Sequence, residues 1–293
     1  MKVSLEALNT SGQAEFVRLL DGLFEAAPWV AEKSFSSRPF ATVASLHDAM
    51  MAAVRGRPRQ DQMAFVSCHP DLAGKVARAG AMAAASVAEQ AGLGLDRLSD
   101  DEARRFERLN SDYRQKFGFP FVICVRRQTR DAVLDAFERR LRNDVDAELA
   151  AALEEIGHIT RLRLVDRVEG AGAPVVTGRL STHVLDTYHG RPATDVTVEL
   201  FEIGKSARAL LTRAVTSRDG RPEHPLIVDR PLRIGTYELA FHIGDYFRSC
   251  GVTREARPFL DVVPVRFGIS EPEGHYHVPL VTTPWSYSVY RGS

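Results

Sequence analysis

Two groups of polar residues in this chain combine side chains that move protons with side chains that stabilise charge. One group lies in the first half, where His69 precedes Glu89. The other lies in the second half and contains His183, Arg221 and His277. An imidazole titrates near neutral pH and can take and return a proton. A guanidinium can hold a planar, oxygen-rich molecule and stabilise a growing negative charge. These residue types predict general acid–base chemistry in both halves.

The first group lies on a pattern that suits a helix. Ser86 and Glu89 are three positions apart, so on a helix they share one face. Other interpretations of the same residues involve no chemistry. His69-Pro70 would also mark the end of a helix, Ser86 with Glu89 would form an ordinary capping box, and the apolar run 119–125 would be plain core.

The second group lies on strand-like and turn-like stretches. His275 and His277 are two positions apart, so on a strand both point to the same face. Arg221 directly follows the Arg-Asp-Gly turn at 218–220. The alternatives are a hydrogen-bonded structural role for His183 and a solvated surface position for Arg221. Three histidines could also ligate zinc.

The elements that must position these groups differ between the two halves. Before about residue 170 the apolar residues recur at helical spacing, and the apolar run 119–125 is too short for a helix. The predicted helical stretches are Phe16 to Phe24, Ala103 to Phe117 behind a Ser99–Glu102 capping box, Val133 to Leu141, and Asp146 to about Arg167.

After about residue 170 the apolar residues alternate, as in half-buried strands. Val196, Val198 and Leu200 share one face, as do the alternate residues from Val263 to Ile269, and turns are predicted at 218–220, 234–236 and 271–274. The fold class predicted is therefore an all-α domain fused to a β-sandwich. We place the domains at 1–167 and 177–293, joined by a Gly/Pro-containing linker at 168–176.

The bulk composition limits the kinds of partner. A length of 293 residues suits two domains, and Lys+Arg equals Asp+Glu at 38 each, so no global field favours nucleic acid or an anionic membrane. The opening MKVSLEALNTSGQ lacks the apolar run of a secretory signal. Cys68, Cys124 and Cys250 are odd in number and form no CxxC pattern, which argues against a zinc ribbon and a disulfide framework. We expect a cytoplasmic protein.

Four motifs in the first half resemble those of 2-oxo-4-hydroxy-4-carboxy-5-ureidoimidazoline (OHCU) decarboxylases. They are HPDLAGK from residue 69, SxxEQ from 86, LNxxYxxKFGFPFV from 109 and ExxxIxxxRL from 155. The resemblance implies that His69 is the catalytic acid/base with Glu89 beside it, and that no cofactor is needed. The positions that it assigns to substrate binding are Pro70, Ser86, Gln90, Phe121, Val122, Ile123, Cys124, Val125 and Arg163.

The second half resembles 5-hydroxyisourate hydrolases, the enzymatic relatives of transthyretin. The motifs are LDTxxGxPA from residue 185, DGR at 219–221 and HYHVPL from 275 with YRGS at the end. The resemblance implies catalytic roles for His183, Arg221 and His277, and no metal, since arginine does not ligate one. It assigns substrate binding to the tail Tyr290, Arg291, Gly292 and Ser293.

Some residues of the second half depart from the family or match none of its catalytic positions. Trp285 and Ser286 replace a smaller aromatic residue and a glycine of the family, which could reshape the turn before the last strand. Three further histidines are interpreted as surface or packing residues: His189, His224 and His242.

Together the two resemblances imply successive steps of urate breakdown, downstream of uricase. The substrates would be 5-hydroxyisourate and OHCU, and the product (S)-allantoin. We expect a homo-oligomer, with a tetramer formed through the β domain and dimer contacts through the α domain. The alternatives are that only one domain is active and the other is an oligomerisation scaffold or, as in transthyretin, a small-molecule carrier.

Overall fold

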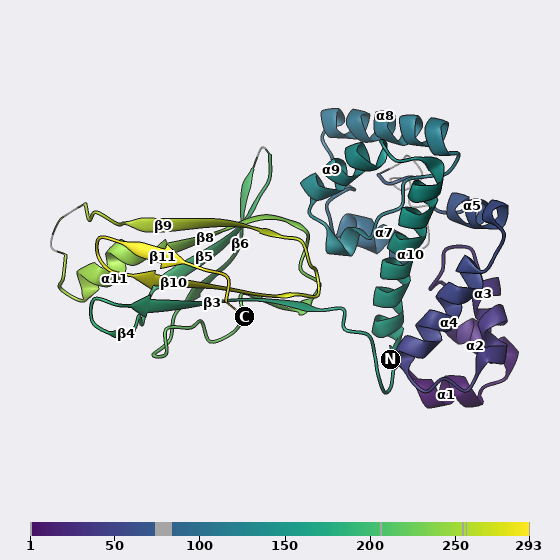
Figure 1. The fold of residues 1–293 in the computed structure, drawn as a ribbon, viewed down its shortest axis with the longest axis horizontal. Coiled ribbons are helices and arrows are strands. Elements are labelled where there is room, and N and C mark those ends of the chain that lie inside the picture. The colour runs from purple at the N-terminus through teal and green to yellow at the C-terminus, as the bar shows by residue number, and fades with distance from the viewer. Residues whose placement is uncertain (1, 74–83, 206, 254, 256, 293) are drawn as a thin grey trace. The chain divides into compact units, whose positions relative to one another are not determined.

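The chain forms two compact units in the computed structural model, which describes residues 2–73, 84–205, 207–253, 255 and 257–292. One unit comprises Met1–Arg126 and Val133–Val176 and is mostly helical, whereas the other comprises Arg127–Ala132 and Thr177–Ser293 and is mostly strands (Figure 1). Within the described residues no helix has the length and apolarity needed to cross a membrane.

The helical part begins and ends with a short parallel strand pair, β1 (Val3–Ser4) with β2 (Val168–Glu169). The helices before residue 168 are α1 (Leu5–Thr10), α2 (Gln13–Leu20), α3 (Trp29–Ser34), α4 (Val43–Arg55), α5 (Arg59–Ser67), α7 (Ala84–Ala91), α8 (Asp100–Phe117), α9 (Arg130–Arg140) and α10 (Val145–Arg167), with 3-10 turns η1 (Phe35–Ser37) and η2 (Val125–Arg127). The long helix α10 carries residues that contact α4, α5 and the 121–125 segment.

Local sequence signals explain the ends of the two longest helices. Ser99 and Glu102 form the predicted capping box of α8, and Gly118 ends the helix in the left-handed region at φ 78°. Asp144 caps α10 by accepting from the Ala147 N–H. The predictions of these two helices are confirmed.

The predicted helix through Phe24 is too long. The α2 helix ends at Leu20, and Gly22 takes the left-handed φ of +74° just beyond it. Leu23 and Phe24 are nonetheless buried in the core, as their apolar character requires. Because the chain leaves the helix here, the backbone of Leu23 becomes available to another part of the unit.

The second unit is a two-layered β structure. The strands are β3 (Gly178–Asp186), β4 (Arg191–Pro192), β5 (Thr197–Ile203), β6 (Arg208–Val215), β7 (Ile227–Arg230), β8 (Gly235–His242), β9 (Val262–Ile269), β10 (His275–Thr282) and β11 (Tyr287–Val289), with helix α11 (Ile243–Ser249) after β8. One sheet has the order β11-β10-β3-β4, with β7 also on β3, and the other has the order β6-β5-β8-β9.

The two sheets bury the faces that the alternation predicts. Val198 and Leu200 of β5 are fully buried, and Val263 and Ile269 of β9 join the same core. The turn predicted at 234–236 is wrong, because β8 begins at Gly235. A Cβ on Gly235 would lie 2.6 Å from the Thr129 side chain, so this glycine permits close packing rather than a turn.

Candidate active sites

A cavity in the helical unit collects most of the residues predicted for the first site. Its empty volume, including the open mouth, is about 520 Å³. The lining residues are Leu23, Glu25, His69, Pro70, Leu72, Ser86, Glu89, Gln90, Phe121, Val122, Ile123, Val125, Ile156, Ile159, Thr160 and Arg163. The walls are mainly apolar, and the polar groups come from α7, α10 and two loops. This is the composition expected of a small-molecule site.

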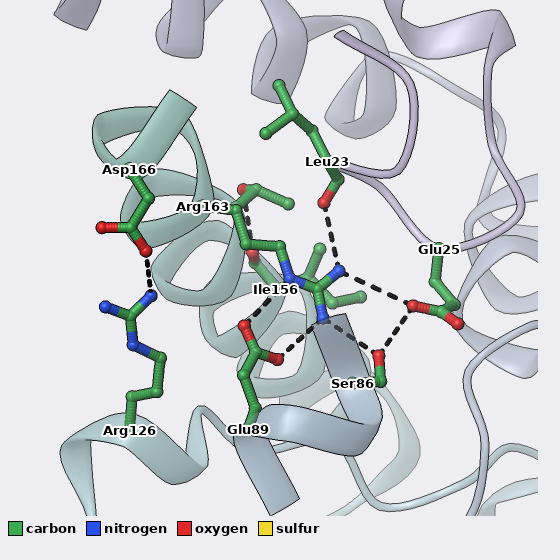
Figure 2. A network of polar contacts seen from close by, with 9 residues as sticks. Leu23, Glu25, Ser86, Glu89, Arg126, Ile156, Arg163 and Asp166 are labelled. Carbon is green, nitrogen blue, oxygen red and sulfur yellow. Dashed lines mark hydrogen bonds and ion pairs between the residues drawn. The ribbon is translucent and has the colours of Figure 1, made fainter. Parts of the chain in front are cut away.

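Arg163 of α10 is the centre of the polar network in this cavity (Figure 2). It forms a two-pronged contact with Glu89, Nε to Oε1 at 3.0 Å and Nη2 to Oε2 at 2.7 Å. Nη2 also donates to Ser86 Oγ at 3.0 Å, and Nη1 donates to the Leu23 carbonyl at 3.4 Å. Ser86 and Glu89 therefore do share one helix face, and that face meets Arg163.

Glu25 is a member of this network that the sequence did not single out. Its Oε2 accepts from Ser86 Oγ at 2.9 Å and lies 3.6 Å from Arg163 Nη1. The residue stands just after the chain leaves α2, in a segment with no recognisable motif. In the sequence Glu25 is only an acidic residue among apolar neighbours, which the structure shows to be buried. That pattern is too common to predict a site residue.

His69 lies in the loop after α5, and its ring is half-buried against the edge of Phe65, with ring centroids 5.5 Å apart. The Nδ1 atom is buried and makes no hydrogen bond of good geometry among the residues that the structure describes, although the backbone of Val66 and Phe65 lies close enough to favour the charged ring. Burial lowers the pKa of the imidazole below its usual value, and the Glu25 carboxylate partly opposes this by favouring the charged form. Near neutral pH the ring is therefore neutral and has a nitrogen available to a bound molecule.

One further contact holds the loop that carries His69. Gln90 Oε1 accepts from the Ala73 N–H at 2.9 Å, which ties α7 to the loop.

Of the residues predicted to bind substrate here, Cys124 does not line the cavity: its side chain packs with Leu162 and Val176 instead. The neighbours Val122, Ile123 and Val125 all line the cavity, so within this segment only the Cys124 side chain is directed to the other cluster.

In the strand unit, parallel pairing of β10 with β3 places the two predicted histidine segments side by side. His277 is opposite Ser181 in the register, and His183 lies two residues further along β3 on the same face. Ser181 Oγ lies 2.9 Å from His277 Nδ1 and 3.0 Å from His275 Nε2. One hydroxyl proton cannot serve both rings, so Ser181 donates to one and accepts from the other. Ser181 was missed from sequence because its partners come from a distant strand.

His183 and Arg221 meet at the turn after β6. His183 Nε2 lies 2.8 Å from the Asp219 carbonyl, and the backbone N–H of Arg221 donates to Asp219 Oδ1 at 3.0 Å. Gly220 adopts φ +79°, and a Cβ there would lie 2.5 Å from the Val184 carbonyl oxygen, which explains the glycine of the Asp-Gly-Arg motif.

The two histidines of this site are kept neutral. Burial is the main cause that lowers the pKa of both His183 and His277, and the Arg221 guanidinium lowers both further. An imidazole with a lowered pKa is unprotonated at neutral pH and can accept a proton from water.

The chain end folds back on this site. The Gly292 N–H donates to the His277 carbonyl at 2.9 Å, and Arg291 lies over the Tyr276 ring, 4.6 Å from its centroid. Tyr290 is 53% exposed. Ser293, the last of the predicted tail residues, lies outside the described residues.

An open hollow of about 750 Å³ lies beside Ser181, Asp219 and Arg221, whereas His183, His277 and the described tail residues are not part of its lining. Its lining includes Arg179, Ser181, Asp219, Arg221 and His224, so His224 stands at the rim of the site rather than apart from it. Among the described residues, no three His, Cys, Asp or Glu side chains are grouped so that they could hold a metal ion.

The other two histidines without a predicted catalytic role are held by carboxylates. His189 Nδ1 lies 2.5 Å from Asp186, and His242 Nε2 lies 3.1 Å from Glu199.

Trp285 packs edge-on to Tyr188 in an exposed turn, with ring centroids 5.7 Å apart. Ser286 closes the same turn by bonding Thr283, so the departure from the family pattern is accommodated locally.

Two protein families match this chain, one on each part. The model of the OHCU decarboxylase family matches residues 9–165, and the model of the HIUase/Transthyretin family matches residues 180–292. The chain therefore belongs to the OHCU decarboxylase family through its helical part and to the HIUase/transthyretin family through its strand part. This agrees with the fold class predicted from the sequence.

Individual relatives and one solved structure agree with this assignment. The 5-hydroxyisourate hydrolase of Deinococcus radiodurans is 54% identical over 39% of this chain and 95% of its own length. The OHCU decarboxylase of Haloferax volcanii is 40% identical over 57% of this chain and 96% of its own length. A crystal structure of (S)-allantoin synthase matches 99% of this chain and 100% of its own, with 34% identity and a TM-score of 0.54. The chain thus has the domain pair of allantoin synthase.

Proposed function

We propose that the chain converts 5-hydroxyisourate to (S)-allantoin in two steps of urate degradation. The strand domain hydrolyses 5-hydroxyisourate to OHCU, and the helical domain decarboxylates OHCU. The proposal is supported by the two family matches on one chain and by a separate polar site in each domain. We place the domains at 1–167 and 177–293, close to the matched ranges, with a linker at 168–176. In the structure this linker belongs to the helical unit, and Arg127–Ala132 belongs to the strand unit.

The observation that carries the decarboxylase site is a cavity that His69 lines together with a fixed Glu89–Arg163 pair, the buried Nδ1 of His69 having no hydrogen-bond partner of good geometry within the described residues. Loss of CO₂ leaves an electron pair on the ring carbon, which the adjacent C=N bond of the substrate can accept without a cofactor. One face of the planar intermediate must then receive a proton, and the neutral His69 can relay it there. Directed protonation on one face would give a single enantiomer.

The roles of Arg163 and Glu89 follow from their mutual contact. Arg163 already donates to Glu89, Ser86 and the Leu23 carbonyl, so we propose that it holds Glu89 in place rather than pairing directly with the substrate carboxylate. A carboxylate fixed in this way can accept from a ureido N–H of the substrate. Pro70, Ser86 and Gln90 line the same cavity and would enclose the ring.

In the hydrolase site we propose that His277 activates the attacking water. Ser181 occupies its Nδ1, which leaves Nε2 as the nitrogen that can meet water. Arg221 would stabilise the charge that grows on the attacked carbonyl oxygen, and His183 would assist proton transfer to the leaving nitrogen. The tail Tyr290 to Ser293 would border the substrate.

We also propose that the chain works as a homo-oligomer in the cytoplasm, with a tetramer through the β domain and dimer contacts through the α domain. The hollow beside Arg221 is open within one chain, and β6 exposes apolar residues, Leu210 and Val215 each at 51%. A neighbouring copy would cover such surface and close the site. Cys68, Cys124 and Cys250 form no disulfide within the described residues, as is common in a reducing compartment. Light scattering of the purified protein would measure the oligomeric state.

One experiment tests both activities. Freshly made 5-hydroxyisourate is added to wild type, His69→Ala and His277→Ala, and absorbance and circular dichroism are recorded together. Wild type should give a persistent dichroic signal from (S)-allantoin. His69→Ala should consume 5-hydroxyisourate at the normal rate but accumulate OHCU, which decays to racemic allantoin and loses its dichroism. His277→Ala should not accelerate the hydrolysis of 5-hydroxyisourate above the spontaneous rate.

The alternatives would give different results. If the helical domain were only a scaffold, wild type would accumulate OHCU and end in racemic allantoin just as His69→Ala does. If His69→Ala yielded (S)-allantoin as fast as wild type, the proton donor would be a residue other than His69. If the strand domain were a carrier, wild type would not accelerate the loss of 5-hydroxyisourate above the spontaneous rate.

A further inference from the structure

The segment 121–125 forms one wall of the decarboxylase cavity without the support of regular secondary structure. Phe121, Val122, Ile123 and Val125 all line the cavity, and residues 121–124 belong to neither a helix nor a strand. The backbone groups of such a segment are not oriented by a ladder of hydrogen bonds. Other residues must therefore fix their directions.

Two side chains outside the cavity fix the directions of the backbone groups in the segment 121–125. Arg140 Nη1 donates to the Val122 carbonyl at 2.8 Å, and Glu155 Oε2 accepts from the Cys124 N–H at 2.8 Å. Neither Arg140 nor Glu155 lines the cavity. The two contacts hold the peptide groups on either side of Ile123.

The geometry of the peptide bond transmits this constraint to Ile123. In a planar trans peptide the C=O and the next N–H point in opposite directions. Fixing the Val122 carbonyl on Arg140 therefore turns the Ile123 N–H away from Arg140. Fixing the Cys124 N–H on Glu155 turns the Ile123 carbonyl away from Glu155. Neither polar group of Ile123 makes a hydrogen bond within the described part of the chain, so both are available to a ligand.

The supports of this segment are themselves held firmly. Arg140 is buried and donates from Nε to Glu148 Oε1 at 2.8 Å, and the fully buried Glu148 also accepts from Asn143 and from the Tyr113 hydroxyl. At the end of the segment, Arg126 pairs with Asp166 of α10 at 2.6 Å (Figure 2).

Glu155 belongs to the ExxxIxxxRL motif, and the site described above gives it no role. Glu155, Ile159 and Arg163 are four residues apart in turn, so they lie along one side of α10. Ile159 and Arg163 line the cavity, whereas Glu155 reaches the Cys124 backbone. The helix that supplies the catalytic network thus also orients the cavity wall.

We propose that Glu155 is a positioning residue of the decarboxylase. It holds the peptide between Ile123 and Cys124 so that Ile123 presents its N–H and C=O as a donor–acceptor pair. That pair complements the adjacent C=O and N–H of an amide or ureido edge in the substrate. The inference rests on the proposed decarboxylase function of the cavity.

The test compares Glu155→Ala, Glu155→Asp and Glu155→Gln with wild type in decarboxylation of freshly generated OHCU. Glu155→Ala removes the acceptor, and Glu155→Asp keeps the charge but shortens its reach. Both should raise KM about tenfold with a smaller change in kcat, since the lost interaction binds ground and transition states alike. Glu155→Gln keeps an acceptor oxygen at the same reach and should stay within about threefold of wild type.

Three controls make the outcome specific. Glu154→Gln changes the exposed neighbour on α10 and should leave KM unchanged. Hydrolysis of 5-hydroxyisourate by the same chain checks the other domain, and unfolding followed by Trp29 fluorescence in a Trp285→Phe background checks the helical one. If Glu155→Ala does not fold, Glu155→Asp against Glu155→Gln decides the matter alone.

The results distinguish the positioning role of Glu155 from the proposed decarboxylase function of the cavity. An active wild type with an unchanged KM in Glu155→Ala or Glu155→Asp would overturn the positioning role. So would a Glu155→Gln variant as impaired as Glu155→Ala, because charge rather than the hydrogen bond would then matter. An inactive wild type would overturn the proposed function together with this inference.

Discussion

Gly292 and His277 approach so closely that no larger residue fits between the chain end and the hydrolase site. The Gly292 N–H donates to the His277 carbonyl at 2.9 Å, and a Cβ on Gly292 would lie 2.6 Å from His277 Cδ2. The glycine of the Tyr-Arg-Gly-Ser end is therefore required by contact with the imidazole itself. The same contact links the position of the tail to the orientation of the ring.

We expect Gly292→Ala to displace the tail or the His277 ring. Because we propose that His277 is catalytic, ring opening should slow by about tenfold to a hundredfold, the usual effect when a catalytic group is slightly misplaced. Decarboxylation should not change. Gly268→Ala is the matched control, because a Cβ at Gly268 meets no atom within 4 Å. Steady-state assays of the two reactions measure both effects. Equal hydrolase rates in the two variants would show that the tail contact does not matter.

The charge of Arg221 should be visible in the titration of the neighbouring histidines. Arg221 lowers the pKa of both His183 and His277, so its removal should raise both pKa values towards the usual value near 6.5. Histidine ring signals in NMR titrations of wild type and Arg221→Gln would measure this. Arg218→Gln removes the neighbouring turn cation and should leave both values where they are in wild type. If the pKa values of His183 and His277 fell or did not change in Arg221→Gln, the Arg221 charge would not act on these two rings as the structure indicates.

The sequence predicted much of this arrangement because the key residues lie in contiguous motifs. His69, Ser86, Glu89 and Arg163 were predicted from such motifs, and the structure places all four on one cavity. The capping box at Ser99 predicted the start of α8, because the signal lies within one helical turn.

The residues that sequence could not supply act across long separations. Glu25 contacts Ser86 and Arg163 only because the chain leaves α2 at Gly22, whereas the apolar spacing continued the helix through Phe24. Ser181 meets His277 only through the parallel register of β3 with β10. No local pattern encodes either contact. Cys124 was included with its neighbours by motif, although its side chain packs with Leu162 and Val176 outside the cavity.

Glu25 should tune the decarboxylase through His69. Its carboxylate raises the pKa of the imidazole, so Glu25→Gln should lower that pKa further. The limb of the decarboxylase pH–rate profile that reports His69 should then move to lower pH, whichever protonation state is the active one. We also expect kcat/KM to fall about tenfold, since Glu25 helps to hold Ser86 and Arg163. Glu32→Gln, at an exposed acidic residue of α3, should leave the profile unchanged.

His47 should make the helical domain sensitive to acid. It is 8% exposed, its Nε2 lies 3.0 Å from Thr160 Oγ1, and burial lowers its pKa to about 4. In the unfolded chain the pKa is near 6.5. Between these values the unfolded state binds one more proton, so the free energy of unfolding falls as pH falls from 6.5 to 4. One proton over this range corresponds to about 3 kcal/mol.

Replacing His47 with glutamine keeps a side chain that can hydrogen-bond to Thr160 but removes this titration. The free energy of unfolding of His47→Gln should therefore depend less steeply on pH than that of wild type, by up to one proton between pH 6.5 and 4. The chain has two tryptophans, Trp29 and Trp285, so in a Trp285→Phe background the fluorescence reports the helical domain alone. Urea unfolding at several pH values gives the slopes. His224→Gln, an exposed histidine of the other domain, is the control. Equal slopes in His47→Gln and wild type would mean that His47 can be protonated without unfolding the domain.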